Sequence, residues 1–94
     1  MARFTGGDIV LFPMPFFGGT DYLVCYITSQ QVGDPHSLVL LASDIRGGIL
    51  TLKSYIRPLY LFAPAEHTIV RKIGMLEPTK LKQVRAIIAS VVDP

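Results

Sequence analysis

The apolar residues of this 94-residue chain occur in short runs, and glycine, proline or aspartate residues bound most of these runs. Runs of this length that are rich in β-branched and aromatic side chains predict β-strands joined by tight turns. We expect strands at residues 8–12 and 37–42. Residues 12–17 contain Pro13 and Pro15 and should leave the sheet as a stiff apolar segment, because proline lacks the amide hydrogen of a sheet ladder.

The stretch from Asp21 to Gln30 is an apolar run that ends in polar side chains. Its length and composition predict a central strand that is buried on both faces. Thr28 and Ser29 lie at the polar end of the run, where their hydroxyls could take part in a reaction. The same hydroxyls also fit a simpler role, since serine and threonine commonly cap turns.

Residues 49–57 alternate between apolar and polar side chains, which predicts a half-buried strand. Pro58 then predicts a bulge, edge or corner before residues 59–62 resume an extended run. The apolar side of the strand carries Leu50, Leu52 and Ile56, and the other side carries Thr51, Lys53, Tyr55 and Arg57.

The last third of the chain combines a short strand with a helix. Residues 68–76 suggest a strand with a turn at Gly74. Residues 78–92 predict an amphipathic helix, because Pro78 suits a first helical turn and apolar residues recur at helical spacing. Several short strands and one terminal helix predict a single domain, residues 1–94, that forms a small, mainly β barrel with the helix packed against it.

Composition adds expectations about partners and location. Half of the residues are hydrophobic, 17% are charged and the mean hydropathy is +0.44, so we expect an apolar surface that forms a homodimer or higher oligomer. The net charge of +2 permits anionic partners without indicating them. The single Cys25 and the absence of a secretory leader predict a cytoplasmic protein, and no run approaches the ~20 apolar residues of a membrane span.

Three segments together resemble the MazF/PemK-like toxins, the mRNA interferases of bacterial toxin–antitoxin modules. They are Gly-Asp-Ile-Val-Leu-Phe-Pro-Met-Pro-Phe at 7–16, Ile-Thr-Ser-Gln at 27–30 and Arg-Lys-Ile-Gly-Met-Leu at 71–76. The segments occur in the family's order, and residues 48–57 coincide with a further strand of the family. The resemblance implies a small SH3-like barrel with a C-terminal helix.

The resemblance also implies a metal-independent, cofactor-free endoribonuclease that acts on single-stranded RNA as a dimer and is blocked by an antitoxin peptide. Attack by a ribose 2′-hydroxyl needs a base, an acid and donors for the phosphorane charge. Thr28 and Ser29 match the family's hydroxyl pair, and Arg57 matches its strand arginine, a planar fork suited to phosphate. The expected RNA-binding residues are Lys53, Tyr55, Arg71 and Lys72.

Two departures from the family predict that cleavage is weak or lost. The family has a basic loop and an Arg-Pro strand before the Thr-Ser strand, whereas here only residues 17–20 connect the two regions, so one barrel strand should be missing and the barrel partly open. Leu59 stands where some relatives carry an aspartate base, and Glu66 and His67 are ordinary loop residues. The alternative is a noncatalytic oligomeric module that binds a peptide at an open sheet edge.

Overall fold

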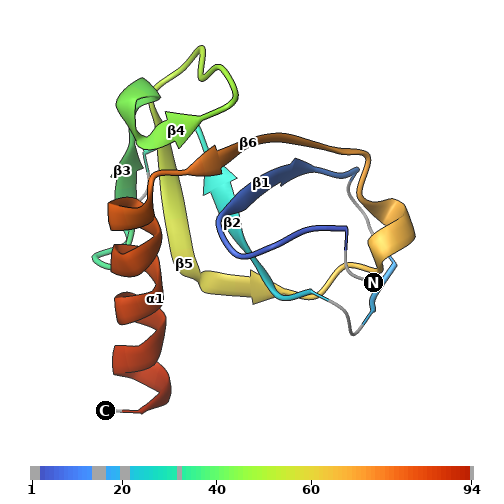
Figure 1. Ribbon diagram of the computed structural model, residues 1–94. Helices are drawn as coiled ribbons and strands as arrows, with labels where there is room; N and C mark the ends of the chain where they lie inside the picture. Colours follow the sequence, from blue (N-terminus) through green and yellow to red (C-terminus); the bar gives the residue numbers. More distant parts are fainter. Residues whose placement is uncertain (1–2, 14–16, 20–21, 32, 94) are drawn as a thin grey trace.

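The computed structural model describes residues 3–13, 17–19, 22–31 and 33–93, which form two three-stranded antiparallel sheets and one helix (Figure 1). Residues 14–16 of the expected stiff segment and residue 21 of the expected central strand lie outside these ranges. In chain order the elements are β1 (Asp8–Leu11), β2 (Val24–Thr28), β3 (Leu38–Leu40), η1 (Ala42–Asp44), β4 (Ile45–Arg46), β5 (Ser54–Phe62), η2 (Glu66–Thr68), β6 (Arg71–Leu76) and α1 (Pro78–Val92).

The first sheet has the strand order β1-β6-β4, and two glycines allow its strands to meet. A Cβ on Gly48 would lie 2.0 Å from the backbone oxygen of Ile73, and a Cβ on Gly74 would lie 3.0 Å from Ile45. Gly74 therefore lies inside β6 as a close-packing position, and the expected turn there was wrong. The two-residue strand β4, which pairs with β6, was not predicted, because so short a strand carries no periodic pattern.

The second sheet has the strand order β2-β5-β3, so β5 is central and β2 lies at an edge. The prediction of a buried central strand at residues 21–30 was wrong, because the described part of that segment pairs only with β5 and contains no fully buried residue. An apolar run indicates a strand, but its place in the sheet depends on pairing with residues far away in sequence.

Strand β5 begins at Ser54 rather than residue 49 and continues through Pro58 to Phe62. Tyr26 pairs with Arg57 and the preceding Cys25 pairs with Leu61, so residues 58–60 bulge out of the ladder. The irregularity expected at Pro58 is thus confirmed, and β5 bends there (Figure 1). The bulge also removes a ladder position at which proline would leave a carbonyl unpaired.

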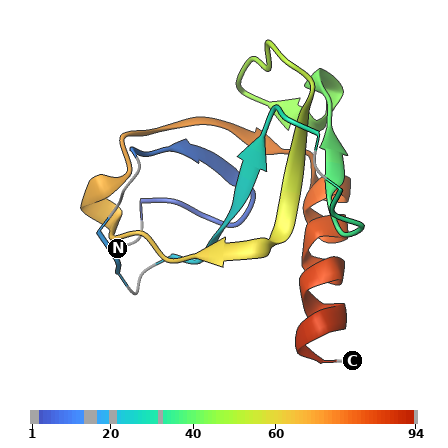
Figure 2. The same ribbon diagram turned by 180° about the vertical axis from the view of Figure 1, so that it is seen from behind.

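Helix α1 spans the predicted residues and packs against the second sheet (Figure 2). Buried Val84 joins Leu40 and Ile56 in the core cluster. Lys80 fixes the first turn, because its Nζ donates to the Val39 carbonyl at 3.0 Å and lies 3.6 Å from Oδ2 of Asp44. The C-terminal end of α1 extends beyond the sheets.

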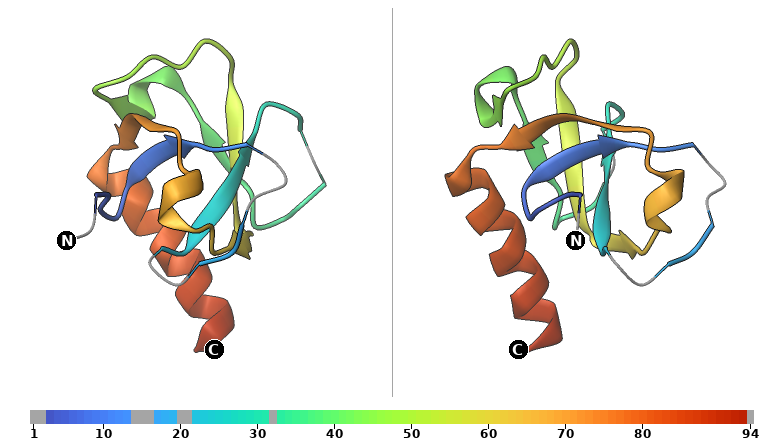
Figure 3. Two further views of the ribbon diagram at one scale, coloured as in Figure 1. Left: turned by 90° about the vertical axis from the view of Figure 1, so that its right-hand side faces the viewer. Right: turned by 45° about the vertical axis from the view of Figure 1, so that its right-hand side comes forward.

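The prediction of a mainly β fold with a C-terminal helix is confirmed. The two sheets face each other (Figure 3), but no ladder between described strands joins them, so they do not form a closed barrel. The SH3-like assignment stays a prediction. In the described part of the chain, no helix has the length and apolar character that crossing a membrane would require.

Candidate functional site

Strand register places four predicted or potential ligand-binding side chains on the outward face of the β2-β5-β3 sheet. Tyr26 lies opposite Arg57, and Thr28 lies opposite Tyr55. Because alternate residues share a face, all four lie on the side opposite Ile56, which is buried in the core. We call Tyr26, Thr28, Tyr55 and Arg57 the tyrosine–arginine face. The predicted grouping of Tyr55 and Arg57 on one side of the strand is confirmed.

Two partners hold the guanidinium of Arg57. Its Nε lies 3.3 Å from Oδ2 of Asp34, and its central carbon lies 3.4 Å from the centroid of the Tyr60 ring. The arginine side chain is only 15% exposed. Within the described residues, the terminal nitrogens of Arg57 have no hydrogen-bond acceptor. Asp34 therefore orients the guanidinium through Nε, and Tyr60 orients it through its planar face. The two terminal nitrogens stay available for an anion such as phosphate.

Asp34 and Tyr60 complete this arrangement, and no sequence pattern singled them out. Asp34 belongs to a turn in which Oδ1 accepts from the backbone N–H of His36 at 2.9 Å and the carbonyl accepts from Ser37. The Asp-Pro pair signals this turn but not the contact with Arg57. Tyr60 reaches Arg57 from the bulge beyond Pro58. A bulge redirects a side chain in a way that period-two alternation cannot predict.

The environment of Asp34 keeps its carboxyl ionised. The backbone N–H of His36 lowers the pKa of Asp34 below its ordinary value of 3.8, partial burial opposes the shift, and the Arg57 guanidinium adds to the lowering. A general base works best when its pKa lies near the operating pH. Asp34 is therefore suited to orienting Arg57 and poorly suited to taking a proton from a ribose hydroxyl.

The predicted hydroxyl pair occupies two different settings. Thr28 is half-buried at the end of β2, and its Oγ1 accepts from the backbone N–H of Gln30 at 3.2 Å, which is the turn-capping role. Ser29 is exposed in the bend that follows. Thr28 and Arg57 are diagonal neighbours across the strand pair, a relation that separates backbones by roughly 7–8 Å. The structure thus brings Thr28 and Arg57 to one face.

The predicted RNA-binding cations divide between the two sheets. Lys53 lies just before β5, with its Nζ 5.8 Å from the Tyr55 ring centroid, and so adds positive charge beside the tyrosine–arginine face. Arg71 and Lys72 lie on β6 in the other sheet. Lys72 forms an ion pair with Asp8, Nζ to Oδ1, at 3.1 Å. These two cations are not part of the tyrosine–arginine face.

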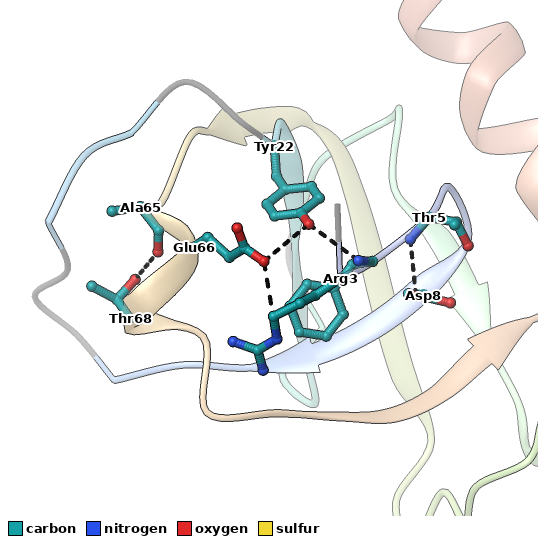
Figure 4. A network of polar contacts seen from close by, with 8 residues as sticks. Arg3, Thr5, Asp8, Tyr22, Ala65, Glu66 and Thr68 are labelled. Atoms are coloured by element: carbon teal, nitrogen blue, oxygen red, sulfur yellow. Dashed lines mark hydrogen bonds and ion pairs between the residues drawn. The ribbon is translucent and has the colours of Figure 1, made fainter. Parts of the chain in front are cut away.

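Glu66 and His67 have structural contacts elsewhere, and those of Glu66 are drawn in Figure 4. Tyr22 donates its hydroxyl hydrogen to Glu66 Oε1 at 3.5 Å, and Arg3 lies 4.0 Å from the same oxygen. The His67 ring stacks on Phe17 with a centroid distance of 6.2 Å. Among the described residues, no three His, Cys, Asp or Glu side chains gather as metal ligands would.

Comparison of the chain with protein-family models, with curated proteins and with solved structures gave no match in any of the three searches. The tyrosine–arginine face offers an oriented cation, two aromatic side chains and a hydroxyl on one surface of the chain.

Proposed function

We propose that this chain is a divergent relative of the MazF/PemK-like toxins that binds single-stranded RNA on its tyrosine–arginine face. The observation that carries the proposal is Arg57, held by Asp34 and Tyr60 with its terminal nitrogens free of acceptors among the described residues. A planar fork of this kind matches two phosphate oxygens.

The tyrosines beside Arg57 supply the second requirement of single-stranded RNA recognition. Unpaired bases stack on aromatic side chains, whereas the stacked bases of a duplex cannot. Tyr26 is 42% exposed and Tyr60 is 52% exposed, so the Tyr26 ring and the side of the Tyr60 ring away from Arg57 are accessible to a base. Tyr55 lies between Arg57 and the cation of Lys53. The face thus alternates sites for phosphate with sites for bases.

Cleavage of the bound RNA is weak or absent under this proposal. The reaction needs a base for the 2′-hydroxyl. Asp34 is the carboxylate beside Arg57, and its lowered pKa and its hydrogen bonds disfavour proton uptake. Leu59 lies in the bulge of β5 and cannot accept a proton. Thr28 and Arg57 retain the ability to stabilise phosphorane charge through donated hydrogen bonds.

The MazF/PemK-like assignment also concerns the fold and the partners. Two open three-stranded sheets are the arrangement expected of an SH3-like barrel that lacks a strand between β1 and β2. An apolar surface supports a homodimer or higher oligomer, and an antitoxin peptide would be its natural inhibitor.

RNA binding can be tested by fluorescence anisotropy with a labelled single-stranded oligonucleotide over a range of salt concentrations. Arg57→Gln should weaken binding at least about tenfold and reduce the slope of log K against log salt by about 0.7, the value for one phosphate on a single strand. Arg71→Gln is the matched control on the other sheet and should change either quantity little. A response that is flat with salt would overturn the proposal.

Base stacking and cleavage need separate measurements. Tyr55→Ala should cost about 1–3 kcal/mol of RNA affinity, and Tyr55→Phe, which keeps the ring, should cost little. Residual cleavage should yield discrete RNA fragments in EDTA that disappear in Thr28→Ala and Arg57→Ala. Fragments that persist equally in both variants would come from a contaminating nuclease.

A second candidate function is a noncatalytic oligomeric module that binds an extended peptide at a sheet edge. The observation that favours it is β2, which pairs on one side only within the described part of the chain. An unpaired strand edge is a template for strand addition. The RNA titration separates the two candidates. If the chain is a peptide-binding module, any RNA affinity it has should not depend specifically on Arg57.

A further inference from the structure

A large apolar cavity lies between the two sheets and the helix. Its volume is about 640 Å³, and it opens to solvent. Partly buried Ile45 of the first sheet, Ile27 of the second sheet and Ile88 of the helix contribute to its wall. Ligand-binding cavities typically measure about 300–1,000 Å³, so this space has the size of a binding site.

The cavity is large for a chain of this size. Protein interiors normally pack with few voids larger than a water molecule. An apolar cavity wall favours apolar molecules over water, because water against it finds few hydrogen-bond partners. The interior is thus suited to hydrocarbon.

One cation in the cavity wall lacks a counter-ion. Arg85 is exposed and also lines the cavity, which places it at the opening. Across residues 3–13, 17–19, 22–31 and 33–93, no acidic side chain pairs with it. The acidic residue in the same wall, Asp8, is already committed, since Oδ1 lies 3.1 Å from Lys72 and Oδ2 accepts from the backbone of Thr5.

The backbone beside Arg85 offers further donors. Gly6 packs so closely against the Arg85 guanidinium that a Cβ at this position would overlap a terminal nitrogen. Gly7 follows with a φ of 93°, a conformation that glycine adopts readily. Both glycines line the cavity, and within the described residues neither backbone N–H has an acceptor. The opening therefore presents positive charge and unpaired donors above an apolar interior.

We propose that this cavity binds a single-chain fatty acid, with the hydrocarbon tail between the sheets and the carboxylate on Arg85. A guanidinium pairs well with a carboxylate through two parallel hydrogen bonds. The single arginine would bind one carboxylate, and the single cavity would hold one hydrocarbon tail. This site is separate from the tyrosine–arginine face, and the proposal does not depend on RNA binding.

The first test uses the purified chain and a dansyl-labelled undecanoic acid as a fluorescent probe. The probe should bind saturably with a blue shift and be displaced by dodecanoate. Methyl dodecanoate lacks the charge and hexanoate lacks most of the tail, so both should compete poorly. Affinity should rise up to about fourfold for each added methylene that becomes buried. Failure of dodecanoate to compete, or equal competition by the methyl ester, would overturn the proposal.

Matched arginine variants locate the carboxylate. Arg85→Gln should weaken dodecanoate binding about tenfold and abolish the preference over the methyl ester, because a charge-assisted hydrogen bond is lost. Arg85→Lys should restore most of that preference. Arg71→Gln removes an equal charge outside the cavity wall and should leave binding unchanged. Equal losses in Arg85→Gln and Arg71→Gln would overturn the assignment of the carboxylate to Arg85.

Cys25 gives a second measurement in the unmodified sequence. It is the single cysteine of the chain, it lines the cavity, and burial raises the pKa of its thiol above 9.0. At alkaline pH, dodecanoate should slow the reaction of Cys25 with a thiol reagent several-fold without changing the mass measured by light scattering. An unchanged labelling rate would contradict the proposal. A stable dimer that excludes the fluorescent probe would also overturn it, because a second copy would then occupy the cavity.

Discussion

Asp34 orients the guanidinium of Arg57, the cation of the tyrosine–arginine face. Its carboxylate joins the turn at His36 to the guanidinium of Arg57 on β5. Under the proposed function, an arginine that is already oriented would reduce the side-chain entropy that RNA binding costs. The ion pair between Asp34 and Arg57 therefore matters more for the orientation of the guanidinium than for the net charge of the tyrosine–arginine face.

The lowered pKa of Asp34 predicts a particular dependence of stability on pH. Because the pKa in the folded state lies below 3.8, the stabilisation from Asp34 is present above the unfolded value and is lost as pH falls through the folded value. The urea midpoint of wild type should exceed that of Asp34→Asn near neutral pH. The difference should begin to shrink as the pH falls below about 4 and should disappear below the folded-state pKa. A difference that persists unchanged in strong acid would contradict this assignment.

Residue-scale prediction from sequence succeeded where strand alternation decides the answer. Tyr55 and Arg57 share a face because they are two positions apart on one strand. The partners Asp34 and Tyr60 could not be predicted, because a turn and a bulge bring them to Arg57 through tertiary structure. Lys72 was predicted as an RNA contact, yet its cation is paired with Asp8.

At the scale of elements, features that depend on local sequence were predicted correctly, whereas features that depend on pairing with distant segments were not. Helix α1 was predictable because a proline at the first helical turn and apolar residues at helical spacing are both local signals. The edge position of β2 and the central position of β5 were not, because strand order depends on which segments meet in space. The two-residue strand β4 is too short to show any period.

The close contact between the β4–β5 connection and β6 predicts that Gly48 and Gly33 differ in how well they tolerate substitution by alanine. In Gly48→Ala the new methyl group would meet the Ile73 carbonyl, so the backbone must shift at a cost of about 1–3 kcal/mol in the free energy of unfolding. Gly33→Ala is the matched control, since a Cβ there meets nothing within 4 Å, and it should change stability by less than about 0.5 kcal/mol. Urea denaturation measures both. Equal effects of the two substitutions would contradict the close approach.

At the scale of the whole molecule, the chain divides its apolar residues unevenly between interior and surface. The fully buried core is small, centred on Leu40, Ile56 and Val84. Large apolar side chains remain exposed, among them Ile49 at 88% and Leu52 at 62% in the connection between β4 and β5. Exposed apolar side chains and unpaired strand edges both favour association with another chain.

This distribution predicts self-association whose strength depends on the exposed connection. The average mass from light scattering should increase with protein concentration, and replacing Ile49 and Leu52 together by serine should shift the equilibrium toward the monomer, because less apolar surface is then removed from water. Val92→Ser at the projecting end of α1 tests whether loss of any exposed apolar side chain has the same effect. A wild-type chain that stays monomeric at every concentration would contradict the prediction. If Val92→Ser has as large an effect as the double substitution of Ile49 and Leu52, the interface does not depend specifically on the β4–β5 connection and includes the end of the helix.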